Sequence, residues 1–194
     1  MARKTNNRPQ RKINPTIIGA GKTEKFYFHH LKEIYDLKIQ VKPRYFGNED
    51  IFYLRKRVAD VVDGGGIAIV VFDVDVSARD ANVKEQYDQF KADYSGNPNV
   101  VFCESMPSIE YWFLLHYIKC NRHFPSSKSV VDILKKYIRD YDKNESFLKQ
   151  TKWVEELCSD NKMALAYDRA KTSDEFTQSH TNIWKAFDAI GLPR

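Results

Sequence analysis

An apolar run that ends in two carboxylates constrains this chain more than any other stretch. Residues 66–75 read Gly-Ile-Ala-Ile-Val-Val-Phe-Asp-Val-Asp, with a glycine cluster before the run and Asp73 and Asp75 after it. Such an unbroken run, rich in β-branched residues, predicts a strand buried on both faces, as in a parallel sheet covered by helices. Asp73 and Asp75 then fall at or just past the carboxyl end of that strand, where open α/β sheets bind their ligands.

The spacing of the two aspartates is compatible with a divalent metal site. Carboxylates are hard oxygen ligands that suit Mg²⁺ or Mn²⁺. A capping or turn role for two carboxylates at a strand end is the structural alternative, and the pair alone does not decide between the two.

The segments around this run complete a parallel α/β pattern. Further strands are expected over residues 15–18, 38–46 and 100–103, of which 38–46 alternates apolar and polar residues as an edge strand does. Helices are expected over residues 25–35, 51–62 and 82–94. About four strands alternating with three helices predict an α/β fold with a parallel sheet flanked by helices.

The chain changes character after residue 105. No further strand-like run is expected there, and residues 109–118, 129–141, 147–157, 162–169 and 181–190 read as helices. We therefore divide the chain into a basic arm (1–12), an α/β core (13–105) and a helical C-terminal part packed on the core (106–194). The arm has the composition of a disordered segment, either solvated or in contact with a nucleic acid backbone.

Composition limits the classes of function. The formal net charge of +5 and the pI near 9.0 favour a polyanionic partner, although many basic proteins bind no nucleic acid. Three widely spaced cysteines form no Cys-x-x-Cys pair, which argues against a zinc or redox site and for reduced thiols in the cytoplasm. No signal peptide or membrane span is expected.

The first glycine turn, Gly-Ala-Gly-Lys-Thr-Glu at residues 19–24, resembles a P-loop only in part. A P-loop requires glycine five positions before Gly21, where this chain has Thr16, and the first strand leaves no room for a phosphate-cradling loop. Nucleoside triphosphate hydrolysis is therefore disfavoured.

Three motifs in order resemble the RloB-like family. They are Ile-Ile-Gly-Ala-Gly-Lys-Thr-Glu-Lys-Phe-Tyr-Phe at 17–28, Val-Phe-Asp-Val-Asp at 71–75 and Ser-Met-Pro-Ser-Ile-Glu-Tyr-Trp-Phe-Leu-Leu-His at 105–116. The family's pattern is roughly Glu-Gly-x-Thr-Glu, Asp-x-Asp and Ser-Asn-Pro-x-x-Glu-x-Trp-x-x-x-His. The resemblance implies a Toprim-type fold, related to that of OLD-family nucleases, and a role in bacterial defence and abortive infection.

The same resemblance implies a set of site residues. Catalytic positions would be Ala20, Glu24, Asp73, Asp75, Glu110 and His116, with Glu24, Asp73 and Asp75 holding Mg²⁺ or Mn²⁺. Lys22 and Lys143 are the candidate nucleic-acid contacts, while Lys135, Lys136 and Arg139 equally suit a solvated helix face. Residues 111–115 would be buried whatever the function, so His116 equally suits a core or cap position.

Ala20 and Met106 depart from the family pattern. Met106 replaces an asparagine, which is a mild change. Ala20 stands where the family has its first glutamate, and alanine can neither carry a proton nor bind a cation. Because Gly21, Thr23 and Glu24 are intact, we interpret Ala20 as an inactivating substitution, of the kind made to trap a substrate or to express a toxic enzyme.

By this resemblance the expected activity is metal-dependent phosphodiester cleavage of nucleic acid. By analogy, RNA and tRNA in particular are favoured over duplex DNA, and a partner defence protein is a candidate activator. The alternatives are a non-catalytic sensor that binds a nucleotide or a partner protein, in which Ala20 would be natural, and a small-nucleotide phosphodiesterase.

Overall fold

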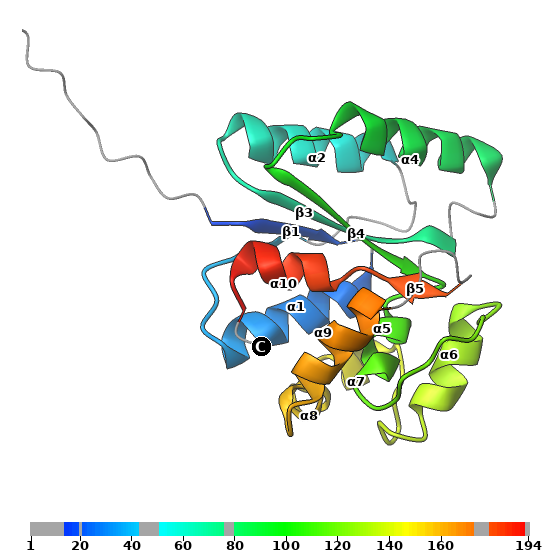
Figure 1. Cartoon of the computed structure of the whole chain (residues 1–194). Helices are drawn as coiled ribbons and strands as arrows, with labels where there is room; N and C mark the ends of the chain where they lie inside the picture. Colours follow the sequence, from blue (N-terminus) through cyan, green and yellow to red (C-terminus); the bar gives the residue numbers. More distant parts are fainter. Residues whose placement is uncertain (1–13, 20, 43–50, 76–79, 173–178, 193–194) are drawn as a thin grey trace, which may run out of the picture.

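The computed structural model describes residues 14–19, 21–42, 51–75, 80–172 and 179–192 (Figure 1). Its centre is a five-stranded sheet in the order β2-β1-β3-β4-β5. The strands are β1 (Thr16–Gly19), β2 (Gln40–Lys42), β3 (Ala68–Asp73), β4 (Val100–Met106) and β5 (His180–Thr181). The first four are parallel, and β5 runs antiparallel to β4. The predicted α/β class is confirmed, and the sheet is compatible with a Toprim-like fold.

The central strand β3 is buried on both faces, as its apolar run predicts. Its alternate residues enter two different hydrophobic clusters, Val70 and Phe72 on one face and Ile69 and Val71 on the other. The helices α2 (Ile51–Asp63) and α4 (Ala81–Asp93) cover the first face. The other face carries α1 (Lys22–Ile34) and α10 (Trp184–Ile190) (Figure 1). The β2 strand lies at the sheet edge, as expected, but predicted strand residues 43–46 lie outside the described residues.

The C-terminal part is mainly helical and packs under the α1 face. It contains α5 (Glu110–Leu115), α6 (Ser127–Leu134), α7 (Glu145–Leu148), α8 (Lys152–Cys158) and α9 (Lys162–Thr172). The Trp112 indole N–H donates to the Tyr27 hydroxyl at 2.7 Å, and Tyr27 and Phe113 pack ring against ring. A single hydrophobic cluster therefore contains residues from both sides of the predicted division at residue 105. That division describes a change in sequence pattern.

Three expectations for this part are wrong. The α6 helix ends at Leu134 instead of continuing to 141, and the predicted helix 147–157 is divided between α7 and α8. Residues 180–181, expected to be helical or unstructured, form β5 instead. A two-residue strand is too short to show an alternating pattern, so its pairing comes from tertiary contacts.

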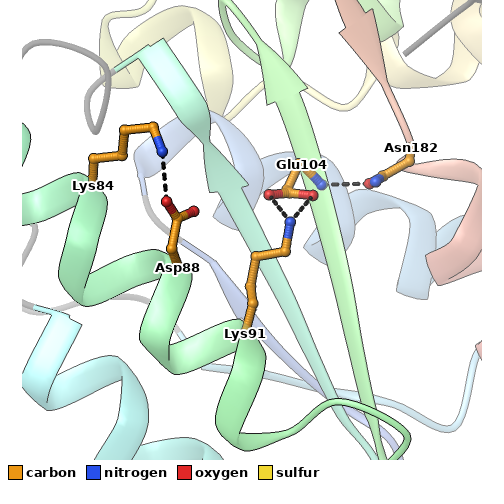
Figure 2. A network of polar contacts seen from close by, with 5 residues as sticks. All are labelled: Lys84, Asp88, Lys91, Glu104 and Asn182. Atoms are coloured by element: carbon orange, nitrogen blue, oxygen red, sulfur yellow. Dashed lines mark hydrogen bonds and ion pairs between the residues drawn. The ribbon is translucent and has the colours of Figure 1, made fainter. Parts of the chain in front are cut away.

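Polar contacts attach the β4 and β5 edge to its neighbours (Figure 2). The Asn182 N–H donates to the Glu104 carbonyl at 2.9 Å, and the Asn182 side chain accepts from the Glu104 N–H at 2.5 Å. The Ser105 and Thr181 hydroxyls lie 2.8 Å apart. On the α4 side, Lys91 donates to both Glu104 carboxylate oxygens, at 2.8 and 3.0 Å (Figure 2). Of the helices in the described residues, none has both the length and the apolar character needed to span a bilayer.

Candidate functional site

A cleft of about 280 Å³ lies at the carboxyl edge of the parallel strands. Asp73 ends β3, Gly21 follows β1, and Ile109 and Glu110 follow β4, so the lining residues come from three neighbouring strand ends. Carboxyl ends of parallel strands meet at one edge, which is why segments far apart in sequence gather here. The full lining is Gly21, Lys22, Thr23, Glu24, Asp73, Ile109, Glu110 and Lys143.

The glycine turn places Glu24 against the start of α1. Gly21 is the N-cap of α1, and a Cβ atom built on Gly21 would lie 2.6 Å from the Glu24 Oε2 atom. Only glycine allows this approach without moving the carboxylate. Glu24 is 4% exposed and stands in the first helical turn, where the helix dipole favours a negative charge.

Asp73 connects the second motif with the third. Its Oδ1 atom accepts a hydrogen bond from the Ile109 N–H at 3.0 Å, which ties the end of β3 to the start of α5. Burial raises the pKa of Asp73 well above its ordinary value, and the nearby Glu24 and Glu110 carboxylates raise it further. Lys143 and the Ile109 N–H act in the opposite direction but do not cancel these effects. The neighbouring carboxyl groups thus oppose the ionisation of Asp73, which a bound cation would favour.

Glu110 is fully buried and has three donors. Its Oε2 atom accepts from the Ser108 hydroxyl at 2.5 Å, and its Oε1 atom accepts from the Tyr141 hydroxyl at 3.1 Å. The Lys143 ammonium lies 2.9 Å from the same Oε1 atom. Burial and the Glu110 carboxylate raise the pKa of Tyr141 well above its ordinary value, so this phenol keeps its proton and donates.

Lysines border the acidic residues on the solvent side. The Lys143 side chain is 45% exposed even though its ammonium is paired with Glu110. Lys22 lies 3.7 Å from Glu145 at the start of α7, and its side chain is 69% exposed. Both predicted nucleic-acid contacts therefore line the cleft and reach solvent.

Some of the predicted catalytic residues line the cleft, and others are not part of its lining. Glu24, Asp73 and Glu110 line one cleft, whereas Asp75 and His116 do not line it. Asp75 is partly buried in a helical turn just after β3. His116 is 1% exposed, and its Nδ1 atom donates to the Trp112 carbonyl at 2.9 Å, as in a core residue. Ala20 lies outside the described residues.

Sequence reasoning missed three contributors to the cleft and its surroundings. The Ser108 hydroxyl and the Ile109 N–H lie within the third motif, but nothing in that motif says that they donate to carboxylates. Tyr141 was expected only as the last residue of a helix. A buried hydrogen bond over 31 residues leaves no periodic signal in one sequence.

The carboxylates of the cleft are the residues that could hold a magnesium-type ion. Its acidic side chains offer only carboxylate oxygens, and a cation would relieve the repulsion among them. In the described part of the chain, no three His, Cys, Asp or Glu side chains come together as a complete metal-binding group. Mg²⁺ commonly keeps several waters and uses one or two carboxylates plus substrate phosphates, so Glu24 and Asp73 fit such an ion.

Comparison with protein-family models matches the chain to the RloB-like protein family over residues 16–190. Comparisons with curated proteins and with solved structures found no match. The matched range contains all three motifs and every described residue of the cleft. The chain belongs to the RloB-like protein family.

Proposed function

We propose that the cleft is the active site of a metal-dependent nuclease that hydrolyses phosphodiester bonds, with RNA, and tRNA in particular, as the favoured substrate. The observation that carries the proposal is the meeting of Glu24, Asp73 and Glu110 with Lys22 and Lys143 in one cleft. Phosphoryl transfer builds charge on phosphoryl oxygens, which needs a metal or cations to offset it. The cleft has carboxylates that could bind a metal, and its two lysines supply cationic side chains.

The side chains take different roles in this proposal. Glu24 and Asp73 would hold Mg²⁺ or Mn²⁺, which when bound supplies charge neutralisation at the phosphate. Lys22 and Lys143 contact the non-bridging phosphate oxygens, since both reach solvent from the cleft wall. Glu110 is a positioning residue, because it already accepts from Ser108, Tyr141 and Lys143 and orients the last two.

Ala20 makes the protein a poor catalyst in this proposal. The residue lies outside the described residues, but its neighbours Gly19 and Gly21 end β1 and line the cleft, respectively. The RloB-like pattern has a glutamate here, the residue that would serve as general acid or base or as a further metal ligand. Alanine removes that function while the described carboxylates remain.

Restoring the glutamate is the main test. Ala20→Glu should raise metal-dependent cleavage of tRNA by about 10²–10⁴-fold, the usual contribution of a positioned acid or base. Both proteins are incubated with total tRNA, single-stranded DNA, duplex DNA and cyclic dinucleotides, with and without EDTA. Cleavage of cyclic dinucleotides alone would instead identify a small-nucleotide phosphodiesterase.

Metal binding is tested separately from cleavage. Calorimetry with Mn²⁺ should show a loss of at least about tenfold in affinity for Asp73→Asn, because Asp73 is one of only two carboxylates proposed to bind the metal. Asp75→Asn is the matched control, since Asp75 does not line the cleft. Equal affinities for Asp73→Asn and the unchanged chain would remove the metal site.

The second candidate is a non-catalytic sensor of nucleotides or of a partner protein, and Ala20 is the observation that favours it. An Ala20→Glu variant that binds metal but cleaves none of the tested substrates, even with lysate from phage-infected cells, would support the sensor assignment. Cleavage that begins only when that lysate is added would support a nuclease of anti-phage defence that a partner protein activates.

A further inference from the structure

A second groove adjoins the cleft on the C-terminal part of the chain. It has a volume of about 290 Å³. The α6 helix and its C-cap contribute Lys128, Val131 and Lys135, and the segment after them contributes Tyr141, Asp142 and Lys143. We call it the α6 groove.

Two residues join the α6 groove to the cleft. Lys143 lines both hollows, and its ammonium is paired with Glu110 inside the cleft. Tyr141 lines the groove while its hydroxyl donates to the same glutamate. A linear polymer bound in the cleft could therefore continue directly into the groove.

The lysines of the α6 groove are arranged along one side of the helix. Lys128, Val131 and Lys135 are three and four residues apart, a spacing that places them on one helical face. Both lysines are exposed, and within the described residues neither ammonium makes an ion pair. The Asp142 carboxylate also lines the groove, but it accepts from the Asn144 N–H at 2.7 Å in a local turn.

The α4 side of the sheet shows what paired lysines look like. There Lys84 lies 2.5 Å from Asp88, and Lys91 donates to both oxygens of Glu104 (Figure 2). Intramolecular carboxylates already offset those charges. Lys143 is likewise paired, with Glu110, so the positive charge that the α6 groove offers to a ligand comes from Lys128 and Lys135.

The adjoining cleft explains why such a groove is needed. The ionised carboxylates among Glu24, Asp73 and Glu110 repel a polyanion, so a nucleic acid strand gains little affinity from the cleft without a metal. Positive charge beside the cleft would offset that repulsion and hold the neighbouring phosphates. Lysine acts on phosphate as a point charge and carries no base readout, so this contact is independent of sequence.

We propose that the α6 groove binds the phosphodiester backbone of a single nucleic acid strand beside the bond held in the cleft, through Lys128 and Lys135. This inference rests on the proposed nuclease function, because it makes the groove a substrate subsite of the same enzyme. It goes further in naming where the strand runs and what holds it.

The test is equilibrium binding without cleavage. Fluorescence anisotropy measures the affinity of the unmodified protein for a labelled single-stranded RNA and for the DNA of the same sequence, in EDTA at several salt concentrations. Each phosphate contact to a single strand contributes about 0.7 to the slope of log K against log salt. Lys128→Ala with Lys135→Ala should lower that slope by about 1.4 and weaken binding at least about tenfold near 0.1 M salt.

A matched pair of lysines controls for net charge. Lys56→Ala with Lys84→Ala removes the same charge from exposed positions on α2 and α4, on the opposite face of the sheet. This pair should leave the slope unchanged, and Lys128→Arg with Lys135→Arg should retain binding. Circular dichroism checks that every variant is folded.

The possible results distinguish a failure of the groove proposal from a failure of the nuclease proposal. Equal losses from the two alanine pairs, no loss from the α6 pair, or no binding of either oligonucleotide would overturn the groove. A loss on both RNA and DNA supports backbone recognition, and a loss on RNA alone supports a subsite that also contacts the ribose. If the α6 pair weakens binding while Ala20→Glu cuts nothing, the groove stands and the nuclease assignment fails.

Discussion

The two ends of α5 differ in what surrounds a buried polar side chain. Glu110 at the first residue of α5 has Ser108, Tyr141 and Lys143 as partners and faces Asp73 across the cleft. The His116 imidazole at the C-cap donates to the Trp112 carbonyl, and among the described residues its buried Nε2 atom has no hydrogen-bond partner. One motif contains both residues, but only Glu110 lies at the cleft.

The two buried groups differ in the charges that surround them. At His116 it lowers the pKa to about 3, so the imidazole is neutral and its ring packs edge to face against Trp112. At the other end, the Glu110 carboxylate keeps a cation within 2.9 Å. A buried polar residue in a motif therefore indicates function only when other charged groups converge on it.

The largest expected effect is a difference in RNA cleavage between variants at the two ends of α5. In the Ala20→Glu background, Glu110→Gln should lower the rate of RNA cleavage by about 10²-fold, because the neutral amide no longer holds Lys143 at the phosphate. His116→Asn should leave the rate unchanged. The measurement is single-turnover cleavage at saturating Mg²⁺.

A control glutamate tests whether any Glu–Lys pair would behave in this way. Glu104 on β4 is also paired with a lysine, Lys91, but its partners lie on the α4 side and it does not line the cleft (Figure 2). Glu104→Gln should cleave at the unchanged rate. A loss for His116→Asn as large as that for Glu110→Gln would return His116 to the site.

The parts of the fold that could be predicted from the sequence rest on local patterns. The run before Asp73 predicts a doubly buried strand because it is short, wholly apolar and rich in β-branched residues, and it lies between a glycine cluster and two carboxylates. The family motif contains both Gly21 and Glu24, and the structure shows them in contact: a Cβ atom on Gly21 would force the Glu24 carboxylate to move.

The remaining features depend on contacts between distant segments. Tyr141 and Lys143 reach Glu110 from a loop after α6, and β5 exists because Thr181 and Asn182 bond to the end of β4. Neither arrangement leaves a period or a turn signal in one sequence. The same holds for His116, whose motif position gives no information on which way the C-cap side chain points.

The second expected effect concerns the His116 end and the pH dependence of stability. The pKa of His116 is lowered from 6.5 to about 3 by burial, with Arg169 and Lys162 of α9 also lowering it, while the Trp112 and Phe113 carbonyls act against this. Between these values the unfolded chain binds a proton that the folded chain does not, so the free energy of unfolding decreases as pH falls. The decrease is about 1.4 kcal/mol per pH unit from this residue.

His116→Asn tests this assignment, because asparagine keeps a donor for the Trp112 carbonyl and does not titrate. Urea unfolding between about pH 6 and about pH 4 should show a shallower pH dependence for the variant by that amount. His29→Asn is the matched control, since the His29 side chain is 53% exposed beside Glu33. An unchanged slope for His116→Asn would mean that the imidazole is hydrated or protonated in the folded chain.

The smallest expected effect is at the Glu110 end, where Tyr141→Phe removes one of three donors. The phenyl ring keeps its packing against Phe113, Phe147 and Trp153, so the change isolates the hydroxyl. A hydrogen bond to a charged group contributes about 1.5–3 kcal/mol when it stands alone. Because Ser108 and Lys143 still donate to Glu110, we expect a loss of only about 1 kcal/mol in the free energy of unfolding.

Tyr167→Phe provides the comparison for this loss, because the Tyr167 hydroxyl also donates to a carboxylate, Asp188, at 2.8 Å, but that carboxylate is exposed. Water replaces the lost donor at Asp188, so Tyr167→Phe should cost less than Tyr141→Phe in urea unfolding at neutral pH. Equal costs would mean that water also reaches Glu110. The glutamate would then be a solvated surface group in practice, and its role in holding Lys143 at the phosphate would lose its physical basis.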